Sequence, residues 1–424
     1  MRALYVFLSY ITFFLVSPLL LLSRKTRMGW KERLGFYPKE LFLEKMEGCI
    51  WFHGASAGDL LSLLPMVKLM RKQCPDRKIV LSTLTNSGRF MAHSRLEKHV
   101  DAIVFAPWDI ECAVRRAIRH ISPELLVLEY TEMWPNLIWE AKAHGAKIAL
   151  TNGRFSKERL SAYRLLLALS GISLSAFDAL MMREKEGLKR ARLLGARPEA
   201  TVVTGSTKFD VLADTGSEEE LEALRCAFGF PAGARILVAG STHEGEEELL
   251  LDVFLRLRSK FQTLRLVLAP RYIDRVDRVC DLASQHKLKV KRRSRAVSGE
   301  VDVVVLDTMG ELSKAYQLSE VVFVGGSFVS RGGQNILEPA AQGRAVLFGP
   351  HMKNFEDCVA VLVGRGGVQV NSKENLENVL SKLLAQSDEL RQLGKMAKAA
   401  VEQVSGASER NVYFLRECLK THGD

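Results

Sequence analysis

The stretch that decides the fold lies in the second half of the chain, where residues 325–338 read Gly-Gly-Ser-Phe-Val-Ser-Arg-Gly-Gly-Gln-Asn-Ile-Leu-Glu. An apolar run over 321–324 precedes it and predicts a buried strand, and residues 339–341 after it predict the start of a helix. The four glycines allow positive φ angles and a close approach of a ligand to the backbone. A helix that begins there directs free N–H groups toward an anion.

This pattern favours a site for a nucleotide phosphate, with Glu338 placed to accept hydrogen bonds from ribose hydroxyls. The stretch is neither the dinucleotide fingerprint G-x-G-x-x-G nor a G-K-[ST] phosphate loop. A plain corner between a strand and a helix is therefore the alternative interpretation.

Short apolar runs that alternate with helical patterns occur in both halves of the chain and predict two parallel sheets covered on both faces. The expected strands of the first half are 50–53, 79–83, 103–106, 125–129, 148–151 and 180–182, and those of the second half are 236–239, 266–269, 301–306, 321–324 and 345–348.

Between the two sets lies a connecting segment, 210–234, with a capping-box pattern from Ser217 to Glu220. We predict an N-terminal anchor over 1–27 and two Rossmann-like domains, one over 28–212 and one over 213–424. Two such doubly wound halves are expected to face a central cleft at their strand carboxyl ends. A loop over 53–59 in the first half, His-Gly-Ala-Ser-Ala-Gly-Asp, precedes a helix over 60–70 and matches the glycine-rich run of the second.

The composition favours anionic partners in a reducing compartment. The net charge is +11 and the pI about 9.3, which suits nucleic acid, acidic lipid or a phosphorylated substrate. Seven scattered cysteines form no C-x-x-C pair, which argues against zinc clusters and disulfides. The basic cluster over 287–295 has no interleaved aromatic residues, so it predicts a solvated or membrane-facing surface rather than a nucleic-acid site.

The N-terminus predicts attachment to a membrane. Residues 3–23 are almost wholly apolar, and Arg24, Lys25 and Arg27 follow directly. About 20 apolar residues can span a bilayer, and the basic flank is expected to stay cytoplasmic. A cleaved signal peptide is the rival interpretation, but no small-x-small cleavage pattern follows. Pro18 interrupts the run, so a bent or interfacial anchor is the alternative to a spanning helix.

One further apolar stretch, 160–172, predicts either a dock for acyl chains or, more commonly, a helix buried in the core. The sequence has no H-E-x-x-H motif and no D-x-D triad of the kind that holds a metal in many transferases. We therefore expect neither a metal nor a cofactor.

Taken in order, many short motifs resemble the Kdo transferases, the 3-deoxy-D-manno-octulosonic acid transferases of lipid A biosynthesis, and the resemblance covers essentially the whole chain. The motifs occupy residues 33–37, 131–136, 152–156, 204–210, 241–246, 270–271, 307–312, 325–338, 349–351 and 354–355.

This resemblance implies a GT-B glycosyltransferase that moves Kdo from CMP-Kdo to a lipid A precursor, lipid IVA, at the inner face of the cytoplasmic membrane. Transfer would invert the anomeric centre, with a carboxylate as general base and without a metal. The alternatives are a related GT-B enzyme with a changed donor or acceptor, and a non-catalytic protein that binds the lipid precursor or CMP. The oligomeric state stays open.

In the first half, the resemblance places Asp59 where the family has a catalytic Glu, although Asp59 could instead only cap its helix. Lys208 matches a lysine that stabilises the transition state, and its alternative is a plain surface lysine. Tyr130 stands where a family Glu accompanies that lysine. Ser56, Glu129, Glu132 and Arg154 are further candidates for lining the acceptor site.

In the second half, Arg271 after Pro270 is expected to bind the CMP phosphate or the donor carboxylate. Met309, Gly310 and Glu311 are expected to pack on the cytosine and bond its polar edge. Phosphate and ribose would be held by Asn335, Ile336, Leu337 and Glu338. His243 and Glu244 would either line this site or cap the helix that follows them.

Overall fold

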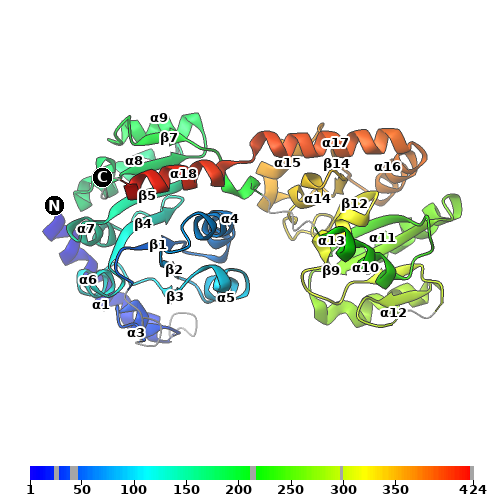
Figure 1. Cartoon of the computed structure of the whole chain (residues 1–424), viewed down its shortest axis with the longest axis horizontal. Coiled ribbons are helices and arrows are strands. Elements are labelled where there is room, and N and C mark those ends of the chain that lie inside the picture. Colours follow the sequence, from blue (N-terminus) through cyan, green and yellow to red (C-terminus); the bar gives the residue numbers. More distant parts are fainter. Residues whose placement is uncertain (23–27, 39–45, 211–215, 297–298, 421–424) are drawn as a thin grey trace. The chain divides into compact units, whose positions relative to one another are not determined.

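The computed structural model describes residues 1–22, 28–38, 46–210, 216–296 and 299–420 (Figure 1). Contacts within the chain divide it into two compact units. The first unit comprises Met1–Asp210 together with Ser405–Asp424, and the second comprises Val211–Val404.

The first unit is built on a parallel sheet of seven strands in the order β3-β2-β1-β4-β5-β6-β7. The order reverses between β1 and β4, which makes this the switch point where ligands of open α/β sheets bind. The strands are β1 (Cys49–His53), β2 (Ile79–Thr83), β3 (Ala102–Phe105), β4 (Pro123–Glu129), β5 (Lys147–Gly153), β6 (Ala179–Met182) and β7 (Thr201–Val203).

Helices cover both faces of this sheet, because its central strands are apolar on both sides and need cover. They are α1 (Arg2–Leu22), α3 (Trp30–Arg33), α4 (Ala57–Gln73), α5 (Asn86–Leu96), α6 (Glu111–Ile121), α7 (Pro135–Ala143), α8 (Leu160–Ser170), α9 (Lys185–Leu193) and α18 (Ala407–Lys420).

The second unit repeats the architecture with the strand order β10-β11-β9-β8-β12-β13-β14 and a switch point between β8 and β12. Its strands are β8 (Arg235–Thr242), β9 (Leu264–Pro270), β10 (Val290–Arg292), β11 (Val303–Val305), β12 (Val321–Val324), β13 (Ala345–Phe348) and β14 (Gly367–Gln369). Its helices are α10 (Glu218–Phe228), α11 (Glu246–Lys260), α12 (Val276–Gln285), α13 (Leu312–Leu318), α14 (Leu337–Ala341), α15 (Glu356–Leu362), α16 (Lys373–Ala385) and α17 (Ser387–Val404).

The prediction of two doubly wound sheets is confirmed, and every expected strand is present. Three strands were missed: β7, β10 and β14. Each is only three residues long, lies at the edge of its sheet and mixes polar with apolar residues, so it lacks the continuous apolar run of a central strand. The predicted capping box at Ser217 and Glu220 is confirmed at the start of α10.

The C-terminal helix corrects the predicted domains, because α18 belongs to the first unit and not to the second. Val412, Leu415 and Leu419 lie in a core of the first unit, and α18 lies beside α4 and β5 (Figure 1). Asp210 fixes its start by accepting hydrogen bonds from the backbone of Gly406 (2.6 Å) and of the next two residues. The predicted boundary at 212 lies outside the described residues.

Helix α8 corrects a second expectation, since only Ser170 of its eleven residues is buried. It is not a core helix. Leu165 and Leu169 are exposed, and α8 contacts α1 on the outside of the first unit.

The place of α18 gives a stability prediction. Replacing the fully buried Leu415 with Ala should lower the unfolding free energy of the first unit by about 2–5 kcal/mol, because a cavity opens in its core. All five tryptophans lie between residues 30 and 139, so tryptophan fluorescence in urea reports the unfolding of the first unit alone. Leu380→Ala, at an equally buried position in the core of the second unit, is the matched control. Equal shifts of the fluorescence transition in both variants would contradict the assignment of α18.

Candidate functional site

One candidate site lies at the switch point of the first unit, where α4 begins after β1. Ser56 is the N-cap of α4, and its backbone N–H and its hydroxyl both donate to Oδ2 of Asp59 (2.8 and 3.0 Å). Asp59 therefore does cap its helix, as the alternative interpretation held. The bonds that the described residues make to this half-buried carboxylate all fall on Oδ2, so Oδ1 remains for another partner.

Tyr130 follows β4, the strand next to β1, and faces the same region. Its backbone is in the left-handed region, with φ of 56°, which is uncommon for a residue with a side chain and turns the chain sharply. Its hydroxyl lies 2.7 Å from Oγ of Ser62, and Nζ of Lys208 lies 5.6 Å from the centre of its ring. That distance suits a cation–π contact.

The negative charge of Asp59 acts on its neighbours. Burial first, and then repulsion from other groups including Asp59, raises the pKa of Tyr130. Burial also raises the pKa of Glu132, again with a contribution from Asp59, although the Trp134 indole donates a 2.9 Å bond to Glu132. The structure therefore brings Asp59, Tyr130, Glu132 and Lys208 together, as the sequence predicted.

Glu129 is a correction, because its side chain is 0% exposed and cannot line an open site. It accepts hydrogen bonds from the Thr151 hydroxyl (2.5 Å) and from the Asn152 amide (2.6 Å). Burial is the main reason that the pKa of Glu129 rises to about 8, so its carboxyl is largely protonated at neutral pH. Glu129 is the last residue of β4, and the chain turns sharply at Tyr130 directly after it.

The network around Glu129 reaches the segment that carries Lys208. The Asn152 amide also donates to Thr207 Oγ1 (2.6 Å), and the Thr207 backbone N–H donates back to Asn152 Oδ1 (2.9 Å). The Thr207 hydroxyl in turn donates to the backbone carbonyl of Ser62 (2.8 Å). Glu129 thus positions both residues that face the site, Tyr130 and Lys208, without touching it.

A separate candidate site lies at the switch point of the second unit, where the glycine-rich loop follows β12. The carboxylate of Glu246 is fully buried and accepts four backbone hydrogen bonds, from residues 243, 326, 327 and 328, at 2.7–3.0 Å. The sequence predicted that phosphate is held further along, at the start of the following helix, residues 335–338. The N–H groups in the first turn of the loop are bonded to a carboxylate of the protein itself.

Cationic groups gather at the carboxyl ends of β8, β9 and β12. His243 is only 6% exposed, and its Nε2 has no hydrogen-bond partner among the residues that the structure describes. Burial first, and then the charges of Arg331 and Arg271, lower the pKa of His243 against the opposite effect of Glu246. The His243 ring also meets the edge of Tyr272 at 5.6 Å. These positive groups suit an anionic ligand.

The other predicted nucleotide contacts differ in how accessible they are. Met309 is 79% exposed beside Gly310, which has a φ of 85°, so both are open to a ligand. Glu311 is already paired with Arg293 (2.7 Å) and with Thr308. Pro270 is the last residue of β9 and is buried, like the rest of that strand.

Residues 335–338 are the group predicted to hold phosphate and ribose. Of these, Ile336 and Leu337 have fully buried side chains, which leaves only their backbone for a nucleotide. Asn335 Oδ1 accepts the Leu337 N–H (3.1 Å). Glu338 lies in the short helix α14. Burial of the Tyr316 side chain is the main reason that the pKa of Tyr316 is raised, and the charge of Glu338 raises it further.

The structure rules out one interpretation of His243 and Glu244, the capping of α11, and places Arg154 at the surface. Neither His243 nor Glu244 caps α11 with its side chain, because Gly245 is the N-cap residue. Glu244 instead pairs with Arg278 on α12 (2.5 Å). Arg154 is exposed directly after β5, at the same edge of the sheet as Tyr130.

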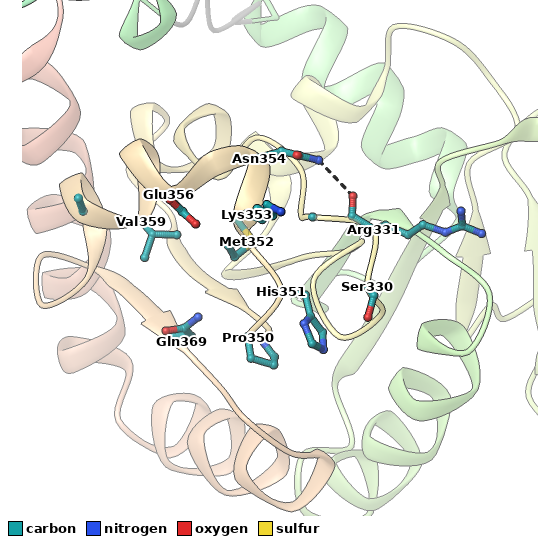
Figure 2. A pocket seen from close by; sticks show the side chains of 12 residues that line it. Ser330, Arg331, Pro350, His351, Met352, Lys353, Asn354, Glu356, Val359 and Gln369 are labelled. Carbon is teal, nitrogen blue, oxygen red and sulfur yellow. Dashed lines mark hydrogen bonds between the residues drawn. The ribbon is translucent and has the colours of Figure 1, made fainter. Parts of the chain in front are cut away.

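A cavity of about 620 Å³ opens beside the glycine-rich loop (Figure 2). Residues 330–332 of that loop form one wall, where the Asn354 amide donates to the Arg331 carbonyl (3.2 Å). His351, Lys353 and Gln369 form other parts of the wall. The residues that line it include none of the predicted nucleotide contacts, although Pro350 and His351 of the family motif at 349–351 are among them.

Sequence reasoning missed Glu246, Arg331 and Arg183 as parts of the site. Arg183 follows β6 and attracts the charges of Glu129 and Tyr130. Glu246 and Arg331 both lie inside the family motifs, at 241–246 and 325–338, but nothing local to the sequence shows which charged residue of a motif turns inward. Among the described residues no cluster of His, Cys, Asp and Glu could hold a metal, and transfer without a metal stays a prediction.

Comparison with solved structures assigns the fold to a class. UDP-GlcNAc 2-epimerase from Neisseria meningitidis matches 87% of this chain and 99% of its own with a TM-score of 0.58 at 13% identity. A glycosyltransferase from Rickettsia africae matches 88% of this chain and 99% of its own with a TM-score of 0.55 at 13% identity. Together with the two parallel seven-stranded sheets, these likenesses define a GT-B-like fold.

Sequence comparison identifies the family. The family model described as 3-deoxy-D-manno-octulosonic-acid transferase (kdotransferase) matches residues 28–211. The 3-deoxy-D-manno-octulosonic acid transferase of Haemophilus influenzae is 30% identical over 94% of this chain and 93% of its own. That of Bordetella pertussis is 30% identical over 87% of each chain. The chain therefore belongs to the Kdo transferase family and is a glycosyltransferase.

The buried Glu129 predicts a pH effect on stability. Its pKa is about 8 in the folded protein against an ordinary value of 4.5, so the folded state favours the protonated form. The stabilisation of the folded state by this protonated carboxyl is full below pH 4.5 and is lost as the pH rises to 8. Glu129→Gln keeps a neutral group that can bond both Thr151 and Asn152. In urea unfolding, the variant should gain stability over the parent between pH 5 and pH 8, on the order of a few kcal/mol. A difference that does not vary with pH would refute an ionisable Glu129.

The four bonds to Glu246 predict a second effect. In Glu246→Gln the amide nitrogen replaces one acceptor oxygen, so two of the four backbone N–H groups lose their partner, and at least one of these lies in the loop. The cost should be about 2–6 kcal/mol, with faster hydrogen exchange at residues 326–328. Circular dichroism and exchange mass spectrometry measure the two effects. Glu244→Gln, whose side chain is exposed, should change stability by no more than about 0.5 kcal/mol.

Proposed function

We propose that this chain transfers Kdo from CMP-Kdo to a hydroxyl of a lipid A precursor, with inversion at the anomeric carbon. The printed function of its relatives, 3-deoxy-D-manno-octulosonic acid transferase, supports the sugar that is moved. The observation that carries the mechanism is the Asp59 carboxylate, which keeps Oδ1 available next to Tyr130 and Lys208.

In the proposed reaction, Oδ1 of Asp59 accepts the proton of the acceptor hydroxyl as its oxygen attacks the anomeric carbon of Kdo. The new bond between this oxygen and carbon forms while the bond between the anomeric carbon and the CMP phosphate oxygen breaks. CMP leaves with the electron pair. The bonds from Ser56 to Oδ2 hold the carboxylate in one orientation, which matters because misplacement by about 1 Å can cost a hundredfold in rate.

Lys208 supplies a positive charge to the same region. Family resemblance expects a Glu beside it, and the Tyr130 ring takes that place here. A ring attracts an ammonium group more weakly than a carboxylate does, so the Lys208 charge is left less neutralised for an anionic substrate. This substitution is compatible with the proposed chemistry.

The donor would bind in the second unit through side chains rather than through the first turn of the glycine-rich loop. The N–H groups of that turn are occupied by Glu246, so Arg271 and Arg331 beside His243 are the groups proposed for the two negative charges of CMP-Kdo. The cytosine and ribose would contact residues 309–311 and 335–338. No metal or cofactor is needed for these steps.

We also propose that the protein works attached to the cytoplasmic membrane, with both units in the cytoplasm and the lipid acceptor in the membrane. Support comes from α1, whose first 18 residues are apolar enough to enter a bilayer and are not buried within the protein. The net charge of +11 would strengthen contact with anionic lipid.

The test combines purified protein in detergent with CMP-Kdo and lipid IVA, and the product is weighed by mass spectrometry. A mass gain of one or more Kdo units is expected. Asp59→Asn keeps an oxygen for the Ser56 cap but removes the base, so turnover should fall about 100- to 10,000-fold with CMP affinity unchanged. Arg271→Ala should instead weaken CMP binding.

Several outcomes would contradict the proposal in different ways. Full turnover by Asp59→Asn would remove Asp59 as the base. Binding of lipid IVA without transfer, while a control transferase works in parallel, would favour a binding role. Transfer to another lipid, or of another sugar, would favour the related GT-B activity.

A further inference from the structure

Helix α1 has two different faces. A stripe that recurs every three to four residues is half-buried against the first unit: Tyr5, Val6, Ser9, Tyr10, Phe13 and Ser17. Most of the other described side chains of the helix are exposed and apolar. The large apolar side chains among them are Leu4, Phe7, Leu8, Ile11, Phe14, Leu15, Val16, Leu19 and Leu22.

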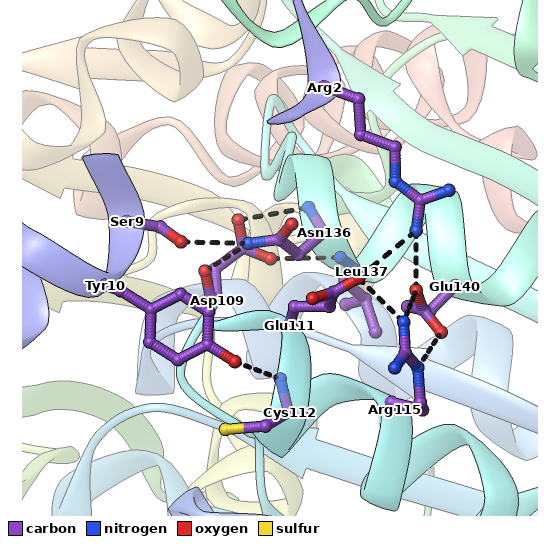
Figure 3. Close-up of polar contacts among 10 residues, drawn as sticks. All are labelled: Arg2, Ser9, Tyr10, Asp109, Glu111, Cys112, Arg115, Asn136, Leu137 and Glu140. Carbon is purple, nitrogen blue, oxygen red and sulfur yellow. Dashed lines mark hydrogen bonds and ion pairs between the residues drawn. The ribbon is translucent and has the colours of Figure 1, made fainter. Parts of the chain in front are cut away.

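One side of α1, from Arg2 to Phe13, contacts the rest of the first unit through polar and aromatic side chains, and we call these contacts the docking seam. Figure 3 shows several of the polar ones. The Tyr5 hydroxyl donates to Asp109 Oδ2 (2.9 Å), and the Tyr10 hydroxyl accepts the backbone N–H of Cys112 (3.1 Å). The Asn136 amide reaches Ser9 Oγ at 3.5 Å.

The docking seam begins at the first turn of the helix. Arg2 pairs with Glu140 (2.7 Å) and approaches Glu111 (3.8 Å), and its guanidinium lies 5.2 Å from the Trp139 ring. Glu140 is held from the other side by Arg115 (3.1 Å). Arg2 thus enters a network of charges on α6 and α7.

Aromatic packing continues the seam further along α1. The Phe13 ring lies 5.3 Å from that of Trp108, which in turn meets Trp30 at 4.5 Å. The Tyr5 ring contacts Trp139 edge-on at 6.0 Å. Contacts with the first unit therefore run from residue 2 to residue 13, about 17 Å along the helix axis.

These contacts conflict with a helix that crosses a bilayer. The hydrocarbon core is about 30 Å thick, so a crossing α1 would carry Arg2 to the far side, away from Glu140. Keeping the docking seam in that orientation would instead pull Glu111, Arg115 and Glu140 deep into hydrocarbon, where each charge costs several kcal/mol. Only a helix that lies along the membrane surface keeps the seam and still places its apolar face in lipid.

We propose that α1 lies in the plane of the membrane as a rigid part of the first unit. Its apolar face is covered by the bilayer, and the side chains inserted among the lipid acyl chains of one leaflet are Leu4, Phe7, Leu8, Ile11, Phe14 and Leu15. The inference rests on the membrane attachment proposed above and adds its geometry. Trp108 and Trp139, on the protein side of α1, would lie near the headgroup level, where tryptophan is favoured.

Two consequences follow from this geometry. The N-terminus stays on the same side of the membrane as both units, whereas a spanning helix places it on the opposite side. The first unit is also held at a fixed orientation to the lipid surface, since the helix that enters the lipid is part of its fold. Helix α8, which contacts α1, exposes Leu165 and Leu169 and adds apolar surface there.

The first test uses the full chain carrying Ala3→Cys in intact spheroplasts, treated with a membrane-impermeant maleimide. We expect no label on residue 3 until the cells are lysed. The seven native cysteines, all at residue 49 or beyond, lie on the cytoplasmic side in either geometry and serve as internal controls. Labelling of Ala3→Cys alone in intact spheroplasts would overturn the in-plane geometry. Recovery of the protein outside the membrane fraction would instead refute membrane attachment itself.

The second test compares two adjacent phenylalanines. Phe14 is 70% exposed on the lipid face, while Phe13 packs against Trp108 in the docking seam. With the in-plane geometry, Phe14→Gln should weaken binding to phosphatidylethanolamine–phosphatidylglycerol vesicles at least about tenfold, because its ring leaves lipid. Phe13→Gln should change vesicle binding less than about threefold and alter tryptophan fluorescence instead. Equal losses of vesicle binding in the two variants would indicate a helix surrounded by lipid and overturn the proposal.

Discussion

A fully buried carboxylate at the switch point of each sheet holds the loops from which the site is built. Glu129 bonds Thr151 and Asn152 in the first unit, and Glu246 bonds four backbone N–H groups in the second. Buried carboxylates are costly unless their oxygens are satisfied. The two units meet this requirement differently, since burial keeps Glu129 largely protonated, whereas Glu246 accepts a full set of donors.

The role of Glu246 changes how the glycine-rich loop can work. In many nucleotide-binding proteins a loop of this kind offers free N–H groups to phosphate. Here the protein supplies its own anion to those groups, and the loop becomes a rigid scaffold. In the proposed mode of donor binding, the negative ligand is recognised by side chains at the neighbouring strand ends, above all Arg271 and Arg331, which act on His243. Side chains can select a particular anionic shape, while a row of N–H groups binds phosphate more generally.

The first unit combines three parts of the chain that lie far apart in the sequence. The sheet, the N-terminal helix α1 and the C-terminal helix α18 all pack into one body. Asp210 caps α18 immediately after the segment of Lys208, so the end of the chain is fixed close to a candidate catalytic residue. Because α1 docks on the same unit, the first unit carries both the proposed base and the proposed contact with lipid.

The sequence alone was enough to determine the two doubly wound sheets, the family and the proximity of Asp59, Tyr130 and Lys208, because these depend on local patterns. Continuous apolar runs predict central strands, and loops at the ends of such strands necessarily meet at one edge of a parallel sheet. Asp59, Tyr130 and Lys208 could therefore be brought together without coordinates. The edge strands β7, β10 and β14 could not be predicted, since half-exposed short strands carry no continuous apolar signal. Only the tertiary structure decided that Glu129 is buried, that Glu246 occupies the loop N–H groups, that α18 returns to the first unit and that α1 is docked along its surface. Each of these depends on which distant group a side chain meets, and an apolar face or a charge in a sequence does not specify its partner.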